Sequence, residues 1–505
     1  MKKTKNFLAV DFGASNGKAT VGRFDGKKLI FLEMHRFENR PVYASQTLYW
    51  DILRLYHELK NSIIKTNRVC RRIESMGVDT WGCDFGLLDK KNRLISNPVH
   101  YRDKRTEGYA ERVRQIIPDS ELYNKTQAQI IEMNTIYQLY SMVLNKSAAL
   151  DGADRLLFMA DLFHFFLTGE TVCEFSNATL SQLYDQKNKK WEKTIIDKLG
   201  IPENIFIETT EPGKVIGSLS RDLCGELECK PVKVSLPCYD TTSEITAIPV
   251  SEENSTKNWC YMNCGTWGMT GIITERPVVS DDARITGFGN EGGFGGMYHF
   301  LKNISALWII QQCRKKWKEE GRENTGWDDI MASAVASPDG DIFIDVDDKV
   351  FEREIFDMPE CIRKYCKKTG QKIPGDNGSI SKLFYESLAL KYSYNLKKLE
   401  KITGRRNEII HMVGGGSRDS LICQYVSNST GLVLLAGPAE TTTAGNILVQ
   451  MHACGEIKNI NEGRRLLIES AGMKTYEPEN ENLWAEKFTK FKNFLYSRVP
   501  NENYF

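Results

Sequence analysis

The sequence predicts an α/β protein of two domains, on three observations. Its 505 residues are about two to three times the length of a typical domain, and its 41% hydrophobic and 26% charged residues are ordinary for a globular chain. Apolar stretches of strand length alternate with longer stretches of helical period. Both halves contain a strand, a small-residue turn and a second strand, which suggests two related domains, although two unrelated hairpins explain it about as well.

The N-terminal segment predicts three short strands over residues 6–35. The apolar run 7–10 ends at Asp11 and passes into a glycine-containing turn at 13–17. An Asp-Gly dipeptide at 25–26 is a strong hairpin signal. A buried strand that ends in a carboxylate and a glycine turn can bring backbone N–H groups and a cation-binding acid against a phosphate. Nucleotide chemistry is therefore the first hypothesis.

The rest of the first half alternates between helical and strand patterns. Residues 48–64 have a helical period, and 75–95 return to strand character around a polar turn. Helical patterns predominate over 107–170. The most apolar window, 156–167, is shorter than the ~20 residues that a bilayer requires and predicts a buried helix. An apolar strand over 232–236 then leads to the segment that contains Asp240.

The second half repeats the strand, turn and strand order. Residues 259–263 and 268–274 read as strands on either side of a turn at Gly265-Thr266. Later, the apolar residues 411–413 run into three consecutive glycines, after which a helix is expected to begin near Ser417. The backbone can approach a flat ligand closely at such a bend.

The turn at 13–17 is not a P-loop. That motif needs four residues between its glycines and Ser or Thr after its lysine. Here three residues separate Gly13 from Gly17, and Ala19 follows Lys18. Three other glycines match the spacing of a dinucleotide-binding fingerprint: Gly287, Gly289 and Gly292. A polar segment precedes them instead of a buried strand, so we interpret this cluster as a loop.

Composition excludes several function classes. The net charge is +1, so no global field indicates a nucleic acid or a membrane surface, and small molecules are the expected partners. The 13 cysteines contain no CxxC pair and the 7 histidines have no ligand spacing, which predicts no structural zinc and a reducing, cytoplasmic location. The apolar run after the N-terminal lysines is too short for a signal peptide.

Several motifs in register give the chain a family resemblance. They are DFGASNGK near the start, GVDTWGCDF at 77–85, YRDKRT at 101–106, CYDTTS, NCGTWGMTG at 263–271, NEGG with LKNISALWIIQQ, and VGGGSRD with AGPAETTTAGN. In order and spacing they resemble the FGGY carbohydrate kinases across nearly the whole chain. Within that family, the DTWG, NEGG, LKN and AGPAE segments are most similar to the rhamnulokinases.

The resemblance implies a fold and a reaction. The fold would be actin-like, with two ribonuclease-H-like domains and a cleft between them: residues 1–245 for the sugar and the phosphate hairpin, and 246–505 for the nucleotide. The reaction would transfer the γ-phosphoryl group of ATP, with Mg²⁺, to the C1 hydroxyl of L-rhamnulose. The partners would be the sugar and ATP, with no nucleic acid and no membrane, and the protein would be a monomer or homodimer.

Asp240 is the expected catalytic residue. From its context alone, after an apolar strand and before a helix, it could equally be an N-cap. The resemblance assigns it as the general base that accepts the C1 hydroxyl proton. A helix N-terminus would also keep its carboxylate ionised.

The resemblance also implies the sugar pocket. Its candidate residues are Gly82, Tyr239, Asp240, Thr241, Trp81 and Asp103. The alternatives are a tight turn for Gly82, core packing for Trp81 and an Asp-Arg surface pair for Asp103. Tyr239 stands where rhamnulokinases and many relatives have histidine. A phenol reaches further and has no pKa near neutrality, so the preferred ketose can differ.

The nucleotide site is expected on two hairpins and two later segments. Asp11 would hold magnesium through water, with a strand-end turn carboxylate as the alternative. The residues that would wrap the phosphates are Gly13, Ala14, Ser15, Asn16, Gly17 and Lys18, although relatives often have arginine at the last. Thr266 would reach the phosphates and Gly415 the adenine or ribose. Asn303 and Gln311 are expected on one face of a helix that meets ATP, with a pair of surface positions as the alternative.

Three rival readings remain open. The acceptor could be another ketose with a free C1 hydroxyl, such as L-fuculose. The protein could be a catalytically idle binding regulator, but such a protein would be expected to have lost Asp11, Thr266 or Asp240. An actin-like chaperone ATPase would carry a further substrate domain, for which the ~60 residues after AGN are too few.

Overall fold

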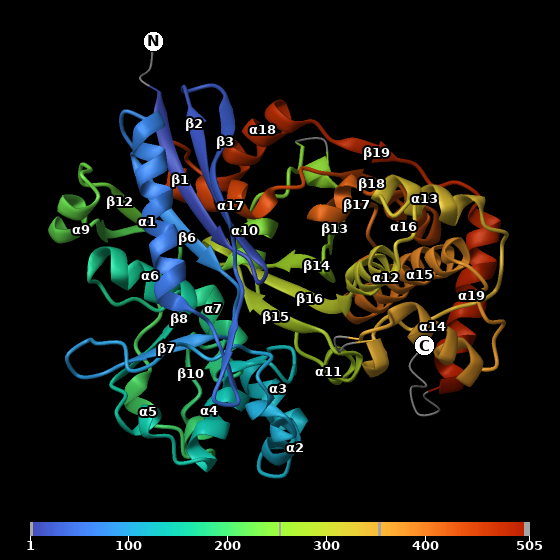
Figure 1. Cartoon of the computed structure of the whole chain (residues 1–505), viewed down its shortest axis with the longest axis horizontal. Coiled ribbons are helices and arrows are strands. Elements are labelled where there is room, and N and C mark those ends of the chain that lie inside the picture. Colours follow the sequence, from blue (N-terminus) through green and yellow to red (C-terminus); the bar gives the residue numbers. More distant parts are fainter. Residues whose placement is uncertain (1–3, 252–253, 352–354, 499–505) are drawn as a thin grey trace. The chain divides into compact units, whose positions relative to one another are not determined.

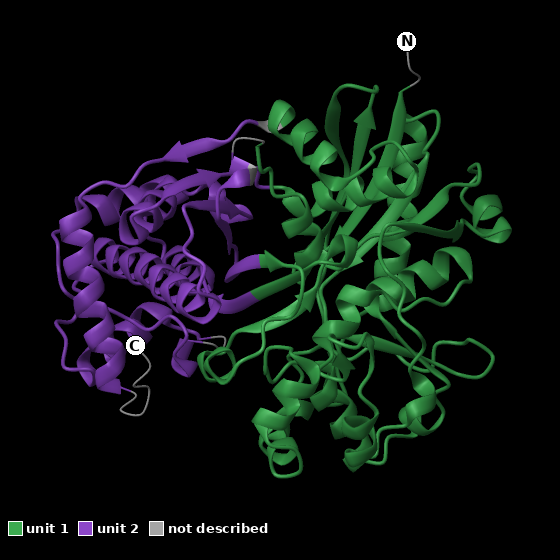
Figure 2. Cartoon of the chain, turned by 180° about the vertical axis from the view of Figure 1, so that it is seen from behind, with its two compact units in different colours: residues 1–251, 273–300, 440–471 green, residues 252–272, 301–439, 472–505 purple. Residues whose placement is uncertain are grey.

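The computed structural model describes residues 4–251, 254–351 and 355–498, and the chain forms two compact units (Figures 1 and 2). The first unit comprises residues 1–251, 273–300 and 440–471, and the second comprises 252–272, 301–439 and 472–505. Each unit is therefore assembled from three separate stretches. The division at residue 245 that the sequence suggests remains a proposal about family domains.

A six-stranded sheet lies at the centre of the first unit, in the order β11-β12-β6-β1-β2-β3. Its strands are β1 (Lys5–Phe12), β2 (Asn16–Phe24), β3 (Leu29–Glu38), β6 (Ser75–Thr80), β11 (Lys214–Ser218) and β12 (Lys233–Leu236). Strands β1, β6 and β12 are parallel, while β1, β2 and β3 form an antiparallel meander. The three strands expected over residues 6–35 are confirmed.

Both faces of this sheet are covered. Leu8, Val10 and Phe12 pack into a core with helices α1 (Ile52–Val69) and α6 (Met159–Thr168). Phe7 and Ala9 point to the opposite face and pack with helix α17 (Thr441–Ala453). Alternate residues of a strand face opposite sides, so β1 is apolar throughout because both sides are buried. Each buried phenylalanine, leucine or valine of this strand contributes about 1.5–3 kcal/mol.

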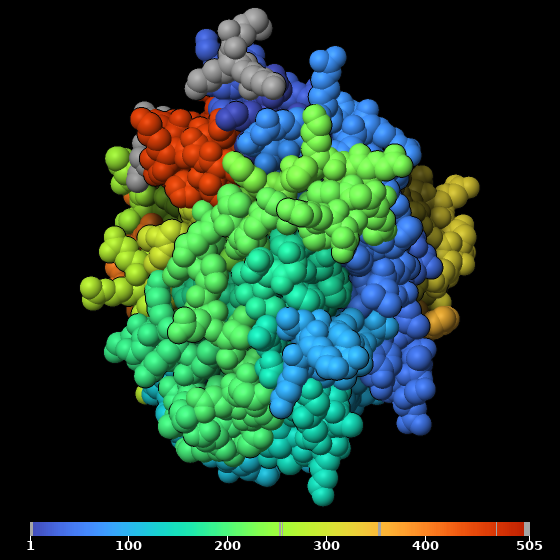
Figure 3. Space-filling view, turned by 90° about the vertical axis from the view of Figure 1, so that its left-hand side faces the viewer, coloured from blue at the N-terminus to red at the C-terminus, as the bar shows by residue number. Residues whose placement is uncertain are grey.

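Smaller elements complete the first unit, and Figure 3 shows the face where residues of about 80–230 lie at the surface. Its two-stranded sheets are β4 (Val42–Ala44) with β5 (Thr47–Tyr49), β7 (Phe85–Leu88) with β8 (Arg155–Phe158), and β9 (Tyr184–Asp185) with β10 (Lys190–Trp191). Its other helices are α2 (Tyr109–Arg114), α3 (Asp119–Thr126), α4 (Thr135–Leu144), α5 (Ala148–Asp151), α7 (Phe175–Leu180), α8 (Lys193–Lys198), α9 (Arg221–Glu226), α10 (Asp240–Thr246), α11 (Asp281–Thr286) and α18 (Ile460–Ala471).

The second unit holds most of a seven-stranded sheet, in the order β15-β16-β14-β13-β17-β18-β19. The strands are β13 (Trp259–Cys264), β14 (Trp267–Thr274), β15 (Gly289–Gly292), β16 (Tyr298–Ser305), β17 (Ile409–Val413), β18 (Val433–Ala436) and β19 (Lys474–Tyr476). Strand β15 belongs to the residues of the first unit. Strand β13 pairs antiparallel with β14 and parallel with β17, which repeats the pairing of β1 with β2 and β6.

Helices surround the strands of the second unit. They are α12 (Trp308–Glu319), α13 (Trp327–Ala336), α14 (Met358–Lys368), α15 (Asn377–Thr403), α16 (Ser420–Thr430) and α19 (Glu481–Arg498). Helix α15 has 27 residues, most of them buried. Among the helices of the described residues, none is long and apolar enough to cross a bilayer.

Some element predictions are wrong in detail. The helix expected from residue 48 begins at Ile52, because Thr47–Tyr49 pair with β4. The window 156–167 begins as strand β8 before helix α6. The glycine cluster interpreted as a loop forms strand β15 at Gly289–Gly292. Strand β8 pairs with β7 (Phe85–Leu88), which lies far away in sequence, and a local pattern does not report such a partner.

Candidate active site

Three parallel strands of the first unit end at the candidate catalytic residues. Asp11 lies near the end of β1, Asp79 lies directly beside it in the register of β6, and Asp240 follows β12. Because β12, β6 and β1 are adjacent and parallel, their carboxyl ends lie at one edge of the sheet. Ligands of open α/β sheets bind at this kind of edge.

The charged groups also share one face of the sheet. Asp11 pairs across the hairpin with Lys18, and the Lys18 Nζ lies 3.6 Å from the Asp11 Oδ2. The ammonium group also forms an ion pair with Glu440, the residue that precedes helix α17. Both partners lie in the first unit. One lysine is therefore held between two carboxylates.

Burial controls the protonation of these acids. It raises the pKa of Asp11, and Lys18 only partly offsets this. Burial and then the charge of Asp11 raise the pKa of Asp79 well above its usual value, although Asn446 and Ser243 oppose the shift. The oxygens of Asp79 lack a hydrogen-bond partner of full bonding geometry among the described residues. Burial opposes charge on Lys18, but Asp11 and Glu440 outweigh it and raise its pKa.

Asp240 is the first residue of α10, and Tyr239 occupies the N-cap position. Asp240 accepts hydrogen bonds at Oδ1 from the Thr241 backbone N–H (2.5 Å) and the Thr241 hydroxyl (3.1 Å). Burial and then the charge of Asp11 raise the pKa of Asp240 to about 8. The expectation that the helix N-terminus keeps this group ionised is wrong, since burial and like charge outweigh the local hydrogen bonds.

The residues before Asp240 and after Asp79 form a buried corner. Tyr239 is 4% exposed, and its hydroxyl donates to Glu291. Gly82 lies against it: an added Cβ would be 3.6 Å from Tyr239 Cδ2 and would overlap Leu180. A larger residue at position 82 would therefore have to displace the end of the Leu180 side chain.

Trp81 belongs to a buried aromatic and polar network. Its Nε1 donates to Asp84 at 2.9 Å, and the Trp50 Nε1 donates to the same carboxylate at 2.6 Å. The two indole rings lie 3.9 Å apart. Gln138 donates to the other oxygen at 2.9 Å. Burial raises the pKa of Asp84 to about 6 against these hydrogen bonds.

Asp103 has structural hydrogen bonds at both oxygens. It precedes the short helix η1 (Lys104–Thr106), accepts from the Arg105 backbone N–H at 2.9 Å and accepts from the Leu48 backbone N–H at 2.7 Å. The Arg105 side chain donates to Gln138 at 2.8 Å rather than pairing with Asp103. Asp103 therefore ties two loops together, and its place in the sugar pocket remains a proposal.

Contacts of the residues at both ends of the turn between β1 and β2 fix its conformation. The Asn39 side chain donates to the Gly13 carbonyl at 2.8 Å, and an added Cβ at Gly17 would overlap Phe37. The three residues between these positions are exposed: Ala14, Ser15 and Asn16. Their exposure leaves the turn backbone accessible to a ligand.

Two nucleotide candidates meet in the second unit. Thr266 lies in the turn between β13 and β14, and its hydroxyl lies 3.3 Å from the Gln311 Oε1 on α12. The neighbouring backbone reinforces this contact, because the Leu307 N–H donates to the Gly265 carbonyl at 2.9 Å. Asn303 lies on β16, so the prediction that it shares a helix face with Gln311 is wrong. The burial along β16 does not alternate, so the sequence carried no period-two signal for this strand.

The triple glycine forms the bend after β17. Gly415 begins the short helix η6 (Gly415–Arg418), and an added Cβ there would meet nothing within 4 Å. At Gly416 an added Cβ would meet Cys264 Cβ at 2.5 Å, so this glycine allows η6 to pack on the end of β13. Open space at Gly415 is consistent with the close approach of a ligand.

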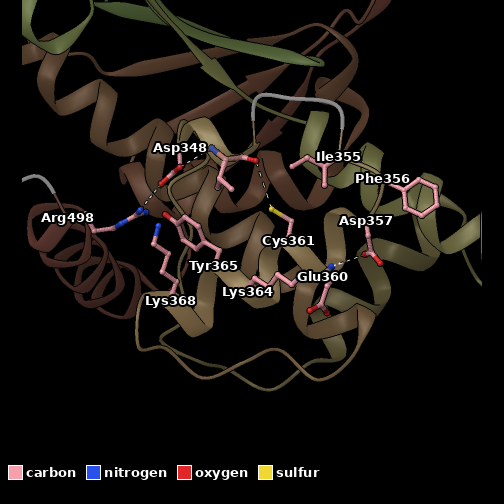
Figure 4. A pocket seen from close by; sticks show the side chains of 11 residues that line it. Asp348, Ile355, Phe356, Asp357, Glu360, Cys361, Lys364, Tyr365, Lys368 and Arg498 are labelled. Carbon is pink, nitrogen blue, oxygen red and sulfur yellow. Dashed lines mark hydrogen bonds and ion pairs between the residues drawn. The ribbon is translucent and has the colours of Figure 1, made fainter.

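A cavity of about 410 Å³ lies elsewhere in the second unit (Figure 4). Its lining includes Cys361, Tyr365 and Lys368 of α14, and Arg498, which pairs with Asp348 at 2.6 Å. None of the residues expected to bind sugar or nucleotide lines it.

Sequence reasoning missed three residues that support the site. Glu440 pairs with Lys18, Glu291 accepts from Tyr239, and Gly445 packs against the backbone of Ser243, where a Cβ would overlap. All three lie within the motifs AGPAETTTAGN and NEGG. Their membership in those motifs was the available signal, but the partners are more than 50 residues away.

Comparisons with known proteins place both halves of the chain. Residues 6–244 match the N-terminal domain of the FGGY family of carbohydrate kinases, and residues 260–454 match its C-terminal domain. The rhamnulokinase of Bacteroides thetaiotaomicron is 34% identical over 491 residues, which cover 97% of this chain and 99% of that protein. The rhamnulokinase of Oceanobacillus iheyensis is 35% identical over 473 residues, with 93% and 97% covered.

Solved structures share the fold. Gluconate kinase from Lactobacillus acidophilus superposes with a TM-score of 0.81 at 14% identity, over 99% of each chain. Ligand-bound xylulose kinase from the same organism has a TM-score of 0.81 at 15% identity, again over 99% of each chain. The expected actin-like fold is thereby confirmed. Together with the matches over both halves, it shows that this chain belongs to the FGGY family of carbohydrate kinases.

Proposed function

We propose that this protein transfers the γ-phosphoryl group of ATP to the C1 hydroxyl of L-rhamnulose, giving L-rhamnulose 1-phosphate. Curated relatives that match nearly the whole chain are rhamnulokinases. The observation that carries the mechanism is the convergence of Asp240 with Asp11 and Lys18 at one edge of the first sheet. Phosphoryl transfer needs an oriented hydroxyl and charge neutralisation around the phosphates, and these residues supply both.

Asp240 is the proposed general base. Its Oδ1 is held by two hydrogen bonds from Thr241, which leaves Oδ2 to accept the proton of the C1 hydroxyl. A base is most effective when its pKa lies near the working pH, and the pKa of Asp240 is about 8. Tyr239 and Gly82 form the adjoining wall of the proposed sugar pocket, with Trp81, Thr241 and Asp103 as further candidates.

The residues present fit ATP with Mg²⁺, which FGGY sugar kinases use. Among the described residues no three His, Cys, Asp or Glu side chains form a complete metal cage. Magnesium is usually held by one or two carboxylates together with waters and phosphates. Burial raises the pKa of Asp11 and of Asp79, so a cation bound beside them would favour their ionised forms. We propose that Asp11 holds the ion through water, and that the ion would neutralise phosphate charge.

The phosphates are proposed to lie on two turns. In the first unit, the backbone from Gly13 to Gly17 and the Lys18 ammonium would bind them. In the second, Thr266 would bind phosphate, while Gln311, Asn303 and Gly415 would contact other parts of the nucleotide. We further propose a cytoplasmic monomer or homodimer, since ATP and the ketose are metabolites of that compartment.

A coupled ADP-release assay tests the function. L-rhamnulose, L-fuculose, L-ribulose, D-xylulose and glycerol are compared as acceptors, with Mg²⁺ and then with excess chelator. We expect selective, magnesium-dependent turnover of L-rhamnulose. Asp240→Asn should lose about 100-fold or more in kcat, as expected for a lost general base. Asp222→Asn, at an exposed position of α9, is the matched control.

Turnover of a different ketose would change the proposed substrate and leave the proposed mechanism in place. Activity of Asp240→Asn near that of the parent protein would show that Asp240 is not the base. No turnover with any acceptor would favour a binding protein.

The pKa of Asp240 also predicts a pH profile. The base must be ionised to accept a proton, so kcat/KM for the sugar should rise with pH and level off at or below about pH 8, because a magnesium ion held by Asp11 would offset the charge that helps to raise the pKa of Asp240. Rates measured from about pH 6 to about pH 9 would check this. If kcat/KM of Asp240→Asn falls at low pH in the same way as that of the parent protein, a group other than Asp240 causes the fall.

A further inference from the structure

The NEGG motif forms a rigid strand beside the proposed base. Strand β15 has four residues, and each one has a distant partner. An added Cβ at Gly289 would overlap the Gln129 backbone, and one at Gly292 would meet the Phe175 ring at 2.5 Å. The Asn290 side chain donates to the Gln127 and Val278 carbonyls, each at 2.9 Å. The strand is therefore fixed on both sides along its length.

This strand bonds to both ends of the turn that contains Asp240. The Tyr239 hydroxyl donates to the Glu291 carboxylate, and the Thr242 hydroxyl donates to the Gly292 carbonyl at 3.1 Å. Asp240 and Thr241 lie between these two attachment points. All of these residues belong to the first unit.

The Tyr239–Glu291 contact is buried on both sides. Tyr239 is 4% exposed and Glu291 is 6% exposed. A buried carboxylate is costly without a donor, and a hydrogen bond to a charged group is about twice as strong as a neutral one. Burial raises the pKa of Glu291 to about 7, and the bond from Tyr239 opposes that rise. A second tether fixes the Tyr239 backbone, whose N–H donates to the Ser176 hydroxyl at 3.2 Å.

We propose that Glu291 is a positioning residue, which holds the Tyr239 phenol as a fixed wall of the acceptor site and thereby sets the position of Asp240. This inference rests on the proposed role of Asp240 as the base. A carboxylate beside a phenol suits acceptors that are small, neutral polyols, since an anionic sugar acid would meet a second negative charge at this wall. The Tyr239 hydroxyl is engaged by Glu291, so it does not act as a free donor toward the sugar.

A double-mutant cycle tests the pair. Tyr239→Phe, Glu291→Leu and the double variant are compared in kcat and in the KM values for sugar and ATP. We expect each single variant to lose about tenfold in kcat/KM for the sugar, with KM for ATP unchanged. The double variant should lose no more than the worse single one. Glu291→Gln keeps an acceptor and should recover most of the activity.

Tyr184→Phe is the matched control, because it removes another buried phenol that bonds to Thr209 at 2.9 Å. It should leave kcat/KM unchanged. If Glu291→Leu does not fold, Tyr239→Phe tests the contact from its other side, and parent-like kcat/KM in that variant would also overturn the inference. Multiplicative losses in the cycle, or parent-like kcat/KM in Glu291→Leu, would overturn the inference. An inactive parent protein would instead contradict the proposed function.

Discussion

The β1–β2 and β13–β14 hairpins of this molecule have the same strand pairing but differ in charge. In the first, Asp11 lies one residue before the end of β1, opposite Lys18 and beside Asp79. In the second, Asn263 lies one residue before the end of β13, opposite Met269 and beside Val413. Matching positions of one topology thus hold three ionisable groups in the first unit and neutral groups in the second.

This difference indicates a division of labour. A sheet edge with buried acids and one lysine can bind a cation and accept a hydroxyl proton, and the lysine and the cation would offset its negative charge where phosphate binds. A neutral edge with an exposed threonine can bind phosphate by hydrogen bonds without an opposing charge. The fold supplies the same backbone at both places, and a few side chains decide which chemistry each can perform.

The sharpest way to break the comparison is to make the first hairpin resemble the second. Asp11→Asn keeps the size of the side chain and removes its charge, so Lys18 would retain only Glu440 as an ion-pair partner. We expect kcat to fall about 100-fold or more, a loss of the size seen when one preorganised electrostatic group is removed from an active site. The ADP-release assay measures the loss, and the affinity for magnesium should fall with it.

Asp89→Asn is a suitable comparison for Asp11→Asn, because Asp89 binds Arg93 on the surface of the same unit. It should leave kcat unchanged. If kcat of Asp11→Asn is within twofold of that of the parent protein, the charge difference between the hairpins plays no part in the mechanism.

The sequence was sufficient to locate both hairpins, because alternating apolar residues and small-residue turns are local signals. It also located Asp11, Gly82, Asp240, Thr266 and Gly415 within motifs. It did not reveal that Lys18 pairs with Glu440, 422 residues away, or that Tyr239 bonds to Glu291. Such partners are brought together by strand order and crossovers, about which residue spacing carries no information.

Two errors have the same physical origin. The interpretation of β15 as a loop rests on the polar segment before it, and its two glycines, which are poor strand formers in isolation, give no strand signal. Asn303 was assigned to a helix because the apolar helix α12 begins only five residues later. In both cases tertiary packing decided the conformation: Gly289 and Gly292 fit against Gln129 and Phe175 where larger residues would overlap.

In both hairpins a glycine packs under an aromatic side chain, and substituting it should have a smaller effect than the loss of Asp11. The pairs that close each turn are Phe12 with Gly17 and Cys264 with Gly268. An added Cβ would overlap Phe37 at Gly17 and the Tyr392 hydroxyl at Gly268. Substitution of either glycine by alanine should lower the free energy of unfolding by about 1–3 kcal/mol through overpacking.

Thermal or urea unfolding of Gly17→Ala and Gly268→Ala measures this cost. Gly225→Ala is the matched control, because a Cβ at that position meets nothing within 4 Å. Equal stability of all three variants would show that the aromatic covers move aside freely. If only one hairpin variant is destabilised, the two turns differ in packing as well as in charge.

The smallest expected effect comes from the reverse exchange, Asn263→Asp, which places an acid at the position that corresponds to Asp11. Asn263 is partly exposed, so the new charge is partly screened by solvent. It would lie near Thr266 without a lysine opposite, because Met269 occupies that position. We expect KM for ATP to rise about threefold to tenfold while KM for the sugar stays unchanged.

The double variant Asn263→Asp with Met269→Lys should recover most of the ATP affinity, because it restores the acid and lysine pair of the first hairpin. Equal ATP affinity in the parent protein and Asn263→Asp would mean that phosphate binds away from this edge, and the assignment of Thr266 would then have to be abandoned.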